Sequence, residues 1–245
     1  MRAVHIMVLS VAAATSAGCL AERCGPPSDL PPERAVLLHP DSSAFRATPP
    51  DSFHVTLVTS RGNIVVQVVR EWSPLGAWRF YNLARNGYFD GTRFYRVLPG
   101  FAAQFGASGY PAVEAAWRDR AIPKDPIRVS NTLGMLTFAQ GKPNTRSTQL
   151  FFNLRDNPEL DEKNFSPIGR VVAGWDVVTA LNGEYGELQP RGDGPAWRCV
   201  YQSGNQYLQS RYPRLDSILR TTVDTTAVRR DTARDATSTD PQGRR

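Results

Sequence analysis

The sequence has few of the residues that build metal and redox sites. Its 245 residues include only three cysteines and three histidines. The histidines (His5, His39 and His54) cluster neither with one another nor with carboxylates, so no metal site is expected. After the N-terminus there is also no apolar run of the roughly 18–20 residues that a membrane-spanning helix requires. These absences argue against a metal-dependent enzyme and against a membrane-spanning domain.

A large excess of one charge is absent as well. The chain holds 29 Lys and Arg residues against 23 Asp and Glu, and the net charge of +6 is only mildly basic. The surplus arginines are scattered toward the C-terminus and are not interleaved with aromatic residues. No nucleic-acid partner is therefore expected. A secreted carbohydrate- or nucleic-acid-binding barrel would need an aromatic platform or a basic stripe, and neither is clearly present.

The first 19 residues have the pattern of an export signal. Arg2 supplies a positive charge, residues 4–14 form a short apolar stretch, and small residues lead to Cys19. The ending Ala17-Gly18-Cys19 resembles a bacterial lipoprotein cleavage site, although Ser16 stands where Leu or Val is usual. Lipid attachment at Cys19, which would tether the chain to a membrane, and plain cleavage nearby both stay open. We expect an exported protein, either periplasmic or lipid-anchored to the cell envelope.

Two cysteines lie beyond this signal. An oxidising compartment would permit a disulfide between Cys24 and Cys199. Cys24, however, lies in a proline-rich leader without clear periodicity. A bridge and two free thiols therefore remain equal alternatives.

The rest of the chain divides into three parts. Residues 20–51 are rich in proline and predict a tether, residues 52–220 carry the folded domain, and the polar residues 221–245 predict a disordered tail. Period-two alternation and apolar runs predict strands. They cover 53–58, 64–69, 92–98, 134–139, 149–154 and 165–172. Helices are predicted from Ser73-Pro74 to Asn86-Gly87 and over 175–181, with a helical turn near 113–118. Two helices among many strands, without a βαβ rhythm, predict a mainly β fold, a barrel or sandwich capped by helices.

One arginine lies among aromatic and apolar residues in the segment Phe94-Tyr95-Arg96-Val97-Leu98-Pro99-Gly100-Phe101-Ala102-Ala103-Gln104. A guanidinium beside apolar groups costs free energy unless it has a partner or a task. The nearest carboxylate in the sequence, Asp90, precedes the predicted strand. An isolated arginine on a strand is usually a surface ion-pair partner. In this context the pattern favours a site that recognises an apolar group beside a carbonyl.

This segment closely resembles the signature of the cyclophilins, the peptidyl-prolyl cis/trans isomerases. The stretches 134–152 and 160–172 resemble the other parts of that signature, and 203–216 resembles the C-terminal extension of a bacterial exported branch. The resemblance covers about residues 53–220. It implies a closed antiparallel β-barrel capped by two α-helices, and rotamase activity that assists the folding of exported proteins. It further implies proline-containing polypeptide clients and no cofactor; we also expect a monomer.

The resemblance also assigns roles to individual residues. It implies Arg96 as the catalytic donor that stabilises the twisted prolyl amide, and Gln104 as a partner of the substrate backbone. It implies that Phe101, Phe151 and Leu160 form a slot for the proline ring. It also implies that Ala139 and Gln140 form the edge along which an extended peptide binds. For Leu160, ordinary core packing is nearly as good an interpretation. Phe165 stands near the position of a family histidine and is interpreted as an apolar substitute.

Several positions depart from the family pattern. Ala102 replaces a common methionine, Glu159 replaces a tryptophan, and Lys142 and Glu162 replace glycines. The tryptophan contributes to cyclosporin binding in the family, so weak sensitivity to that inhibitor is predicted. The altered rim keeps a second function open, a non-catalytic chaperone or scaffold module that binds proline peptides on the same barrel.

Overall fold

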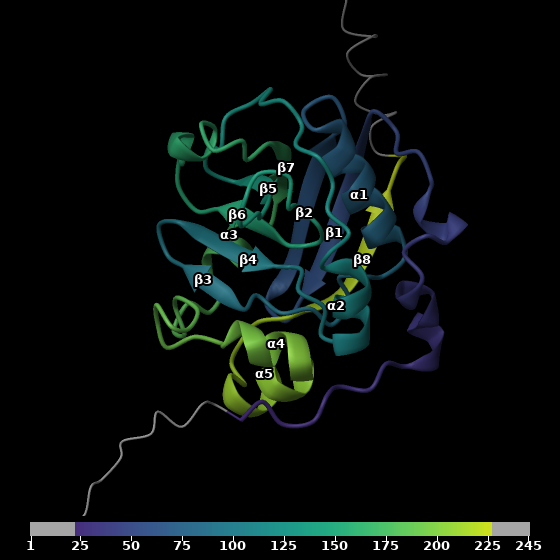
Figure 1. The fold of residues 1–245 in the computed structure, drawn as a ribbon. Helices are drawn as coiled ribbons and strands as arrows, with labels where there is room; N and C mark the ends of the chain where they lie inside the picture. Colours follow the sequence, from purple (N-terminus) through teal and green to yellow (C-terminus); the bar gives the residue numbers. More distant parts are fainter. Residues whose placement is uncertain (1–22, 227–245) are drawn as a thin grey trace, which may run out of the picture.

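The computed structural model describes residues 23–226 (Figure 1). The predicted signal peptide (1–19), including Cys19 as the candidate lipid-attachment site, and the part of the predicted tail from 227 onward lie outside these residues.

The centre of the molecule is one antiparallel sheet that curls into a barrel, as predicted. Eight strands pair in the order β3-β4-β6-β5-β7-β2-β1-β8. They are β1 (Ser52–Thr59), β2 (Gly62–Val69), β3 (Arg96–Leu98), β4 (Ala102–Phe105), β5 (Met135–Phe138), β6 (Leu150–Asn153), β7 (Pro167–Ala173) and β8 (Ile218–Asp224).

The first hairpin follows directly from the alternation in the sequence. β1 pairs with β2 from Ser52↔Val69 to Thr59↔Gly62. Phe53, Val55 and Leu57 face the core and are fully buried, while the residues between them are only half-buried. The period of two therefore places one face of the hairpin in the core, and this prediction is confirmed.

The two outer strands, β3 and β8, approach each other at their ends. The bridge Arg93↔Ser217 joins the residues that precede them, and the N–H of Phe94 donates to the carbonyl of Asp216 at 2.9 Å. The prediction of a disordered tail from residue 221 was wrong for its first residues, because β8 continues to Asp224 and pairs with β1. Without β8 this edge of β1 would have unpaired backbone groups, and a polar Thr-rich segment can pair with them without a large apolar face.

The sheet is flanked by more helices than the two that were predicted. The predicted helices are present as α1 (Pro74–Arg85) and α3 (Trp175–Thr179), and the predicted helical turn is α2 (Pro111–Trp117). Sequence analysis missed α4 (Trp197–Ser203) and α5 (Asn205–Arg211). Both are only seven residues long and lack strong end signals. None of the helices within residues 23–226 has the length and apolar character to cross a bilayer.

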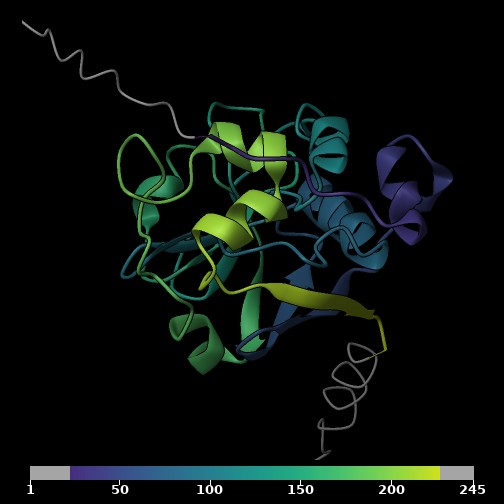
Figure 2. The same cartoon turned by 90° about the horizontal axis from the view of Figure 1, so that it is seen from below.

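The predicted tether lies against the domain over its described part. The 3-10 helices η1 (Pro32–Leu38) and η2 (Ser43–Phe45) bury Leu37 and Phe45 almost completely. The indole N–H of Trp117 donates to the carbonyl of Leu37 at 2.7 Å. From residue 23 the chain first passes α4 and α5 and then reaches η1 (Figures 1 and 2). A few apolar residues among the prolines are enough to dock this segment.

Residues 182–216, which we call the C-terminal extension, form a second small core below the barrel. Tyr207, Leu208 and Tyr212 of this core pack around Cys199 and reach Tyr95 of the barrel. Cys199 forms a disulfide with Cys24. The sequence left open whether these cysteines form a disulfide or stay free, and the structure shows the disulfide.

Candidate functional site

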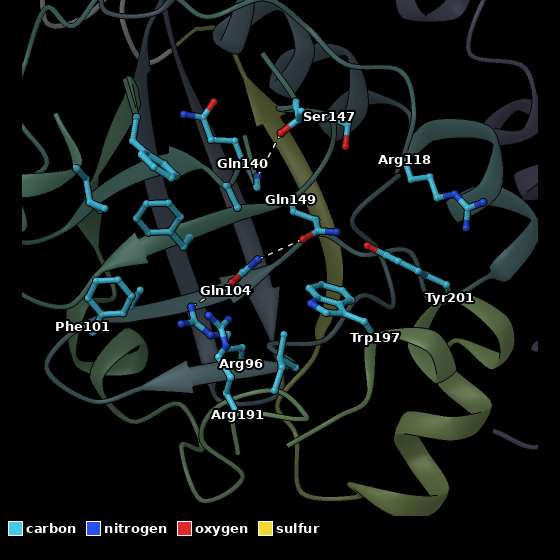
Figure 3. Close-up of a pocket in the computed structure, with 18 residues that line it drawn as sticks. Arg96, Phe101, Gln104, Arg118, Gln140, Ser147, Gln149, Arg191, Trp197 and Tyr201 are labelled. Atoms are coloured by element: carbon cyan, nitrogen blue, oxygen red, sulfur yellow. Dashed lines mark hydrogen bonds between the residues drawn. The ribbon is translucent and has the colours of Figure 1, made fainter. Parts of the chain in front are cut away.

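A cavity of about 430 Å³ opens beside β3, β4 and β6 (Figure 3). All eight residues that the sequence assigned to catalysis or substrate binding line it. They are Arg96, Phe101, Gln104, Ala139, Gln140, Phe151, Leu160 and Phe165. The fold therefore brings together residues that four separate segments of the chain supply.

One side of the cavity is an apolar slot. Ala102, Phe151 and Leu160 form a buried cluster, with Phe101 and Phe165 packed against it. The ring centroids of Phe151 and Phe165 lie 6.0 Å apart in an edge-to-face arrangement. Leu160 is only 7% exposed and still lines the cavity, so both interpretations of this residue hold. The walls of this slot suit a small saturated ring.

The pairing of β3, β4 and β6 places the polar side chains beside the slot. Arg96 lies opposite Gln104, and Gln104 lies opposite Phe151 on the next strand. Directly opposed residues of antiparallel strands share a face of the sheet. Gly100, with a φ of 71°, makes the tight turn that lets β4 fold back on β3. One row across three strands thus joins the guanidinium, the amide and the slot.

The guanidinium of Arg96 has a carboxylate partner that sequence analysis did not find. Its Nε and Nη2 donate to the two carboxylate oxygens of Glu187, each at 2.7 Å. The remaining terminal nitrogen, Nη1, donates to Oε1 of Gln104 at 3.3 Å. The Arg96 and Glu187 side chains are only 15% and 23% exposed. The hydrogen bonds from Arg96 hold the pKa of Glu187 below its usual value.

The loop around Glu187 is built to hold this carboxylate in place. The N–H of Leu188 donates to Oε1 of Glu187 at 2.8 Å, and the N–H of Gly194 donates to the Glu187 carbonyl at 2.9 Å. A Cβ at Gly192 or Gly194 would lie 2.5 or 2.7 Å from that carbonyl oxygen. Only glycine allows this close approach, so a side chain at either position would displace the loop from the Glu187 backbone.

A hydrogen bond to Gln149 holds the side chain of Gln104 in its orientation. Its Nε2 donates to Oε1 of Gln149 at 3.2 Å, and the hydroxyl of Tyr95 donates to the same oxygen at 2.9 Å. Burial raises the pKa of Tyr95 well above its usual value, so its hydroxyl stays protonated and donates. The result is a hydrogen-bonded row from Arg96 to Tyr95 that fixes the orientation of both amides.

The predicted peptide-binding edge is partly occupied within the protein. The N–H of Ala139 donates to the carbonyl of Gln149 at 2.9 Å, so it continues the β5–β6 pairing. Gln140 donates through Nε2 to the carbonyl of Lys163 at 3.0 Å. Its Oε1 is buried and has no partner within residues 23–226. The N–H of Ala139 is therefore already used, and an incoming peptide could not pair with it as the structure stands.

The wall opposite the slot consists of residues that sequence analysis missed. Arg118 follows α2, and Trp197 and Tyr201 come from the C-terminal extension, whereas Arg191 of the same extension lies beside Arg96 (Figure 3). Trp197 and Tyr201 stack with ring centroids 5.2 Å apart, and the Arg118 guanidinium lies 5.5 Å from the centroid of the Tyr201 ring. None of these residues lies in a segment that carried the family signature, so no local signal identified them.

Metal-ligating side chains do not gather in the described part of the chain. Within residues 23–226, no group of three or more His, Cys, Asp or Glu side chains is arranged to hold a metal ion. The site consists of the Arg96–Glu187 ion pair, several amides, an apolar slot, and an aromatic wall with two further arginines nearby.

Comparison with known proteins covers most of the barrel. Residues 54–194 match the family model described as cyclophilin type peptidyl-prolyl cis-trans isomerase/CLD. The chain is 36% identical over 133 residues to a peptidyl-prolyl cis-trans isomerase of Schizosaccharomyces pombe, covering 52% of this chain and 84% of that protein. It is 29% identical over 159 residues to peptidyl-prolyl cis-trans isomerase A of Dickeya dadantii, covering 63% and 80%.

Solved structures share the fold. A crystal structure of a cyclophilin type peptidyl-prolyl cis-trans isomerase from Cryptosporidium parvum superposes with a TM-score of 0.54. The superposition covers 71% of this chain and 98% of that one, at 17% sequence identity. At this identity the likeness concerns the arrangement of the strands and helices.

Proposed function

The chain belongs to the cyclophilin-type peptidyl-prolyl cis-trans isomerase family, and from this premise we propose how its pocket carries out the reaction and on which proteins. The activity is rotation about Xaa-Pro peptide bonds. We propose that the slot holds the proline ring and that Arg96 stabilises the twisted amide.

The reaction needs no nucleophile. Partial double-bond character of the C–N bond sets a barrier of about 18–20 kcal/mol. When the bond twists, resonance is lost and the prolyl nitrogen regains a lone pair. A fixed N–H donor aimed at that nitrogen binds the twisted state better than either planar state, which lowers the barrier.

Counting donors shows what Arg96 can offer. A guanidinium has five N–H groups. Glu187 accepts two of them and Gln104 accepts one. Two N–H groups, one on each terminal nitrogen, have no partner among the described residues. In our proposal one of them donates to the prolyl nitrogen, and Glu187 is the residue that orients the guanidinium.

The observation that carries this proposal is the place of the cation beside the slot. The Cζ atom of Arg96 lies 5.7 Å from the ring centroid of Phe101, a wall of the slot. A proline ring in the slot would therefore have its nitrogen within reach of the guanidinium. A module that only bound proline peptides would need the slot but no oriented donor at its edge.

The test is isomerisation of Xaa-Pro peptides by the chain and by its Arg96→Ala variant. Loss of one transition-state donor is expected to lower kcat/KM by a factor of about 10²–10³. Arg155→Ala is the matched control, because the Arg155 guanidinium lies 5.9 Å from the same Phe101 ring but pairs with Glu159 outside the pocket. Equal activity of Arg96→Ala and the parent would refute the role of Arg96. A parent that binds the peptides without accelerating isomerisation would favour the binding module.

We further propose that the chain is exported and assists the folding of exported proteins. Support comes from the signal pattern of residues 1–19 and from the Cys24–Cys199 disulfide, since such bonds persist in oxidising compartments. The test is fractionation of bacterial cells that express the full chain or its Cys19→Ala variant with a labelled fatty acid. Label in the parent that is absent from the variant supports lipidation, and export without label supports plain cleavage. Retention of the parent in the cytoplasm would refute export.

A further inference from the structure

We propose that the pocket contains a second compartment, opposite the proline slot, that binds an acidic side chain of the client next to its proline. The compartment is lined by Arg118, Trp197 and Tyr201, and Arg191 lies at its edge beside Arg96 (Figure 3). This inference rests on the proposed function, because it names the class of peptide that the same pocket selects.

The compartment comes mainly from outside the common barrel. Trp197 and Tyr201 lie on α4, beyond residue 194, where the family match ends. Arg191 lies on the loop that leads to this helix, and Arg118 follows α2. The selectivity that we propose therefore depends on the aromatic residues of the C-terminal extension together with Arg118, which lies within the family match.

The aromatic part of the compartment is rigid. The disulfide partner Cys199 lies between Trp197 and Tyr201 on α4 and ties this helix to the N-terminal segment. The Trp197 ring packs edge-to-face on Tyr95, with ring centroids 5.1 Å apart. A wall that is already in place does not need to be ordered when a ligand binds, so more of the contact energy appears as affinity.

The compartment presents positive charge and hydrogen-bond donors. Of the residues within 23–226 that line the whole pocket, three are arginines and none is Asp or Glu. The carboxylate of Glu187, next to the pocket, is held by Arg96 at 2.7 Å and lies 3.8 Å from Arg191. Arg118 has Asp119 at 3.4 Å, and that carboxylate is 87% exposed. A new carboxylate can replace this loose contact at little cost.

The neutral groups on this wall also favour an acceptor. Burial raises the pKa of Tyr201, which keeps its hydroxyl protonated near neutral pH. The indole of Trp197 has a donor and no acceptor. Figure 3 shows the Tyr201 hydroxyl directed toward Gln149 in the interior of the pocket. A basic side chain would meet repulsion from the arginines, whereas a carboxylate would find both charge and donors.

The ligand is a peptide carboxylate because the compartment shares one cavity with the slot. Gln104 and Gln149, joined at 3.2 Å, lie between the two halves. A ligand that fills both halves carries a small apolar ring and a carboxylate on one chain, as a proline with a neighbouring Asp or Glu does. The cavity of about 430 Å³ has room for both groups.

The test compares peptides that contain one proline and a Glu, Gln or Lys at each of three positions on either side. At one position we expect kcat/KM for the Glu peptide to exceed that for the Gln peptide by about two- to five-fold, the size of a partly exposed ion pair. The ratio should approach one in high salt, which screens exposed charges. The Lys peptide should be the poorest of the three.

Two variants locate the effect. Arg118→Gln should lower the Glu-to-Gln ratio toward one, because it removes a charge from the compartment. Arg198→Gln removes the same charge from α4, but Arg198 bonds to Gln202 and does not line the pocket, so the ratio should persist. Because the readout is a ratio, a general loss of activity in either variant does not affect it.

The outcomes separate this inference from the proposed function. Activity with a ratio near one at every position, or with a preference for Lys, would overturn the acidic compartment and leave the isomerase proposal intact. A ratio that falls equally in Arg198→Gln would also overturn it. If no peptide is isomerised, the isomerase proposal fails, and binding of the Glu and Gln peptides measured by calorimetry still tests the compartment.

Discussion

Replacing Glu187 with glutamine would keep the shape of the group that holds Arg96 and remove its charge. The carboxylate accepts two hydrogen bonds of 2.7 Å from the guanidinium. Glutamine can accept only one of them and turns its own N–H₂ group toward the cation. A hydrogen bond to a charged group contributes about 1.5–3 kcal/mol.

The size of the loss follows from the exposure of the pair. The two side chains are 15% and 23% exposed, so solvent screens the pair partly and the lower end of that range applies. About 1.4 kcal/mol corresponds to a factor of ten, so Glu187→Gln should lower kcat/KM about ten-fold. Complete removal of the guanidinium in Arg96→Ala should cost more, because then no donor remains at all.

The assay is isomerisation of one Xaa-Pro peptide with kcat and KM measured separately. The loss should lie mainly in kcat, because the slot that binds the ground state is unchanged. Glu184→Gln is the matched control. It removes the same charge from the same loop, but Glu184 pairs with Arg214 at 2.7 Å and does not touch Arg96.

The pH profile adds a second readout. Because the pKa of Glu187 is lowered, its carboxylate stays charged at and above its usual pKa and is protonated only as the pH falls through the lowered value. Parent activity should therefore fall in acid toward that of Glu187→Gln, and the two profiles should converge. The reasoning is refuted if a folded Glu187→Gln variant keeps kcat/KM within two-fold of the parent, or if it becomes faster.

Three further predictions concern stability and the Glu187 loop. Burial raises the pKa of Glu114 from 4.5 to about 7, so the folded chain binds this proton more tightly than the unfolded chain does. The free energy of unfolding should therefore fall by about 3 kcal/mol as the pH rises through this window, and urea titrations of Glu114→Gln should lack that component; identical pH dependence in both proteins would contradict this. Cys24→Ser opens the Cys24–Cys199 bridge and should lower the free energy of unfolding by about 2–5 kcal/mol, as should reduction of the parent; an unchanged urea midpoint would count against it. Gly192→Ala would place a Cβ 2.5 Å from the Glu187 carbonyl oxygen and should reduce kcat/KM as Glu187→Gln does, whereas parent-like activity would show that the loop can adjust.

The sequence was a good guide where neighbours along the chain decide the structure. Alternating apolar residues such as Phe53, Val55 and Leu57 predicted the first hairpin, because a strand needs only its own period of two to define a buried face. The signature around Arg96 and Gln104 predicted the slot and its polar edge, and the structure places every residue assigned to that site on one cavity.

The sequence was a poor guide where the partner lies far away along the chain. β8 was missed because its pairing depends on the edge of β1, and the short helix α4 is held by a disulfide to Cys24 rather than by its own helix signals. Other statements made from the sequence remain predictions. They are the roles of the individual site residues, the monomeric state, the export signal and the weak sensitivity to cyclosporin.

Arg96 shows which features could be predicted from the sequence and which could not. Its place among aromatic residues, together with Phe101, Gln104 and the second signature segment, marked Arg96 as a candidate for the site, because burial of an unpaired charge is costly. Its partner Glu187, 91 residues away, could not be found from local pattern. Periodicity predicted a mainly β fold and the resemblance to the cyclophilin signature predicted the slot, whereas only tertiary folding decided which carboxylate orients the guanidinium and which side chains form the opposite wall. Those contacts depend on how the C-terminal extension packs against the barrel. Packing between segments far apart in the chain produces no repeating pattern of residues in the sequence of either segment.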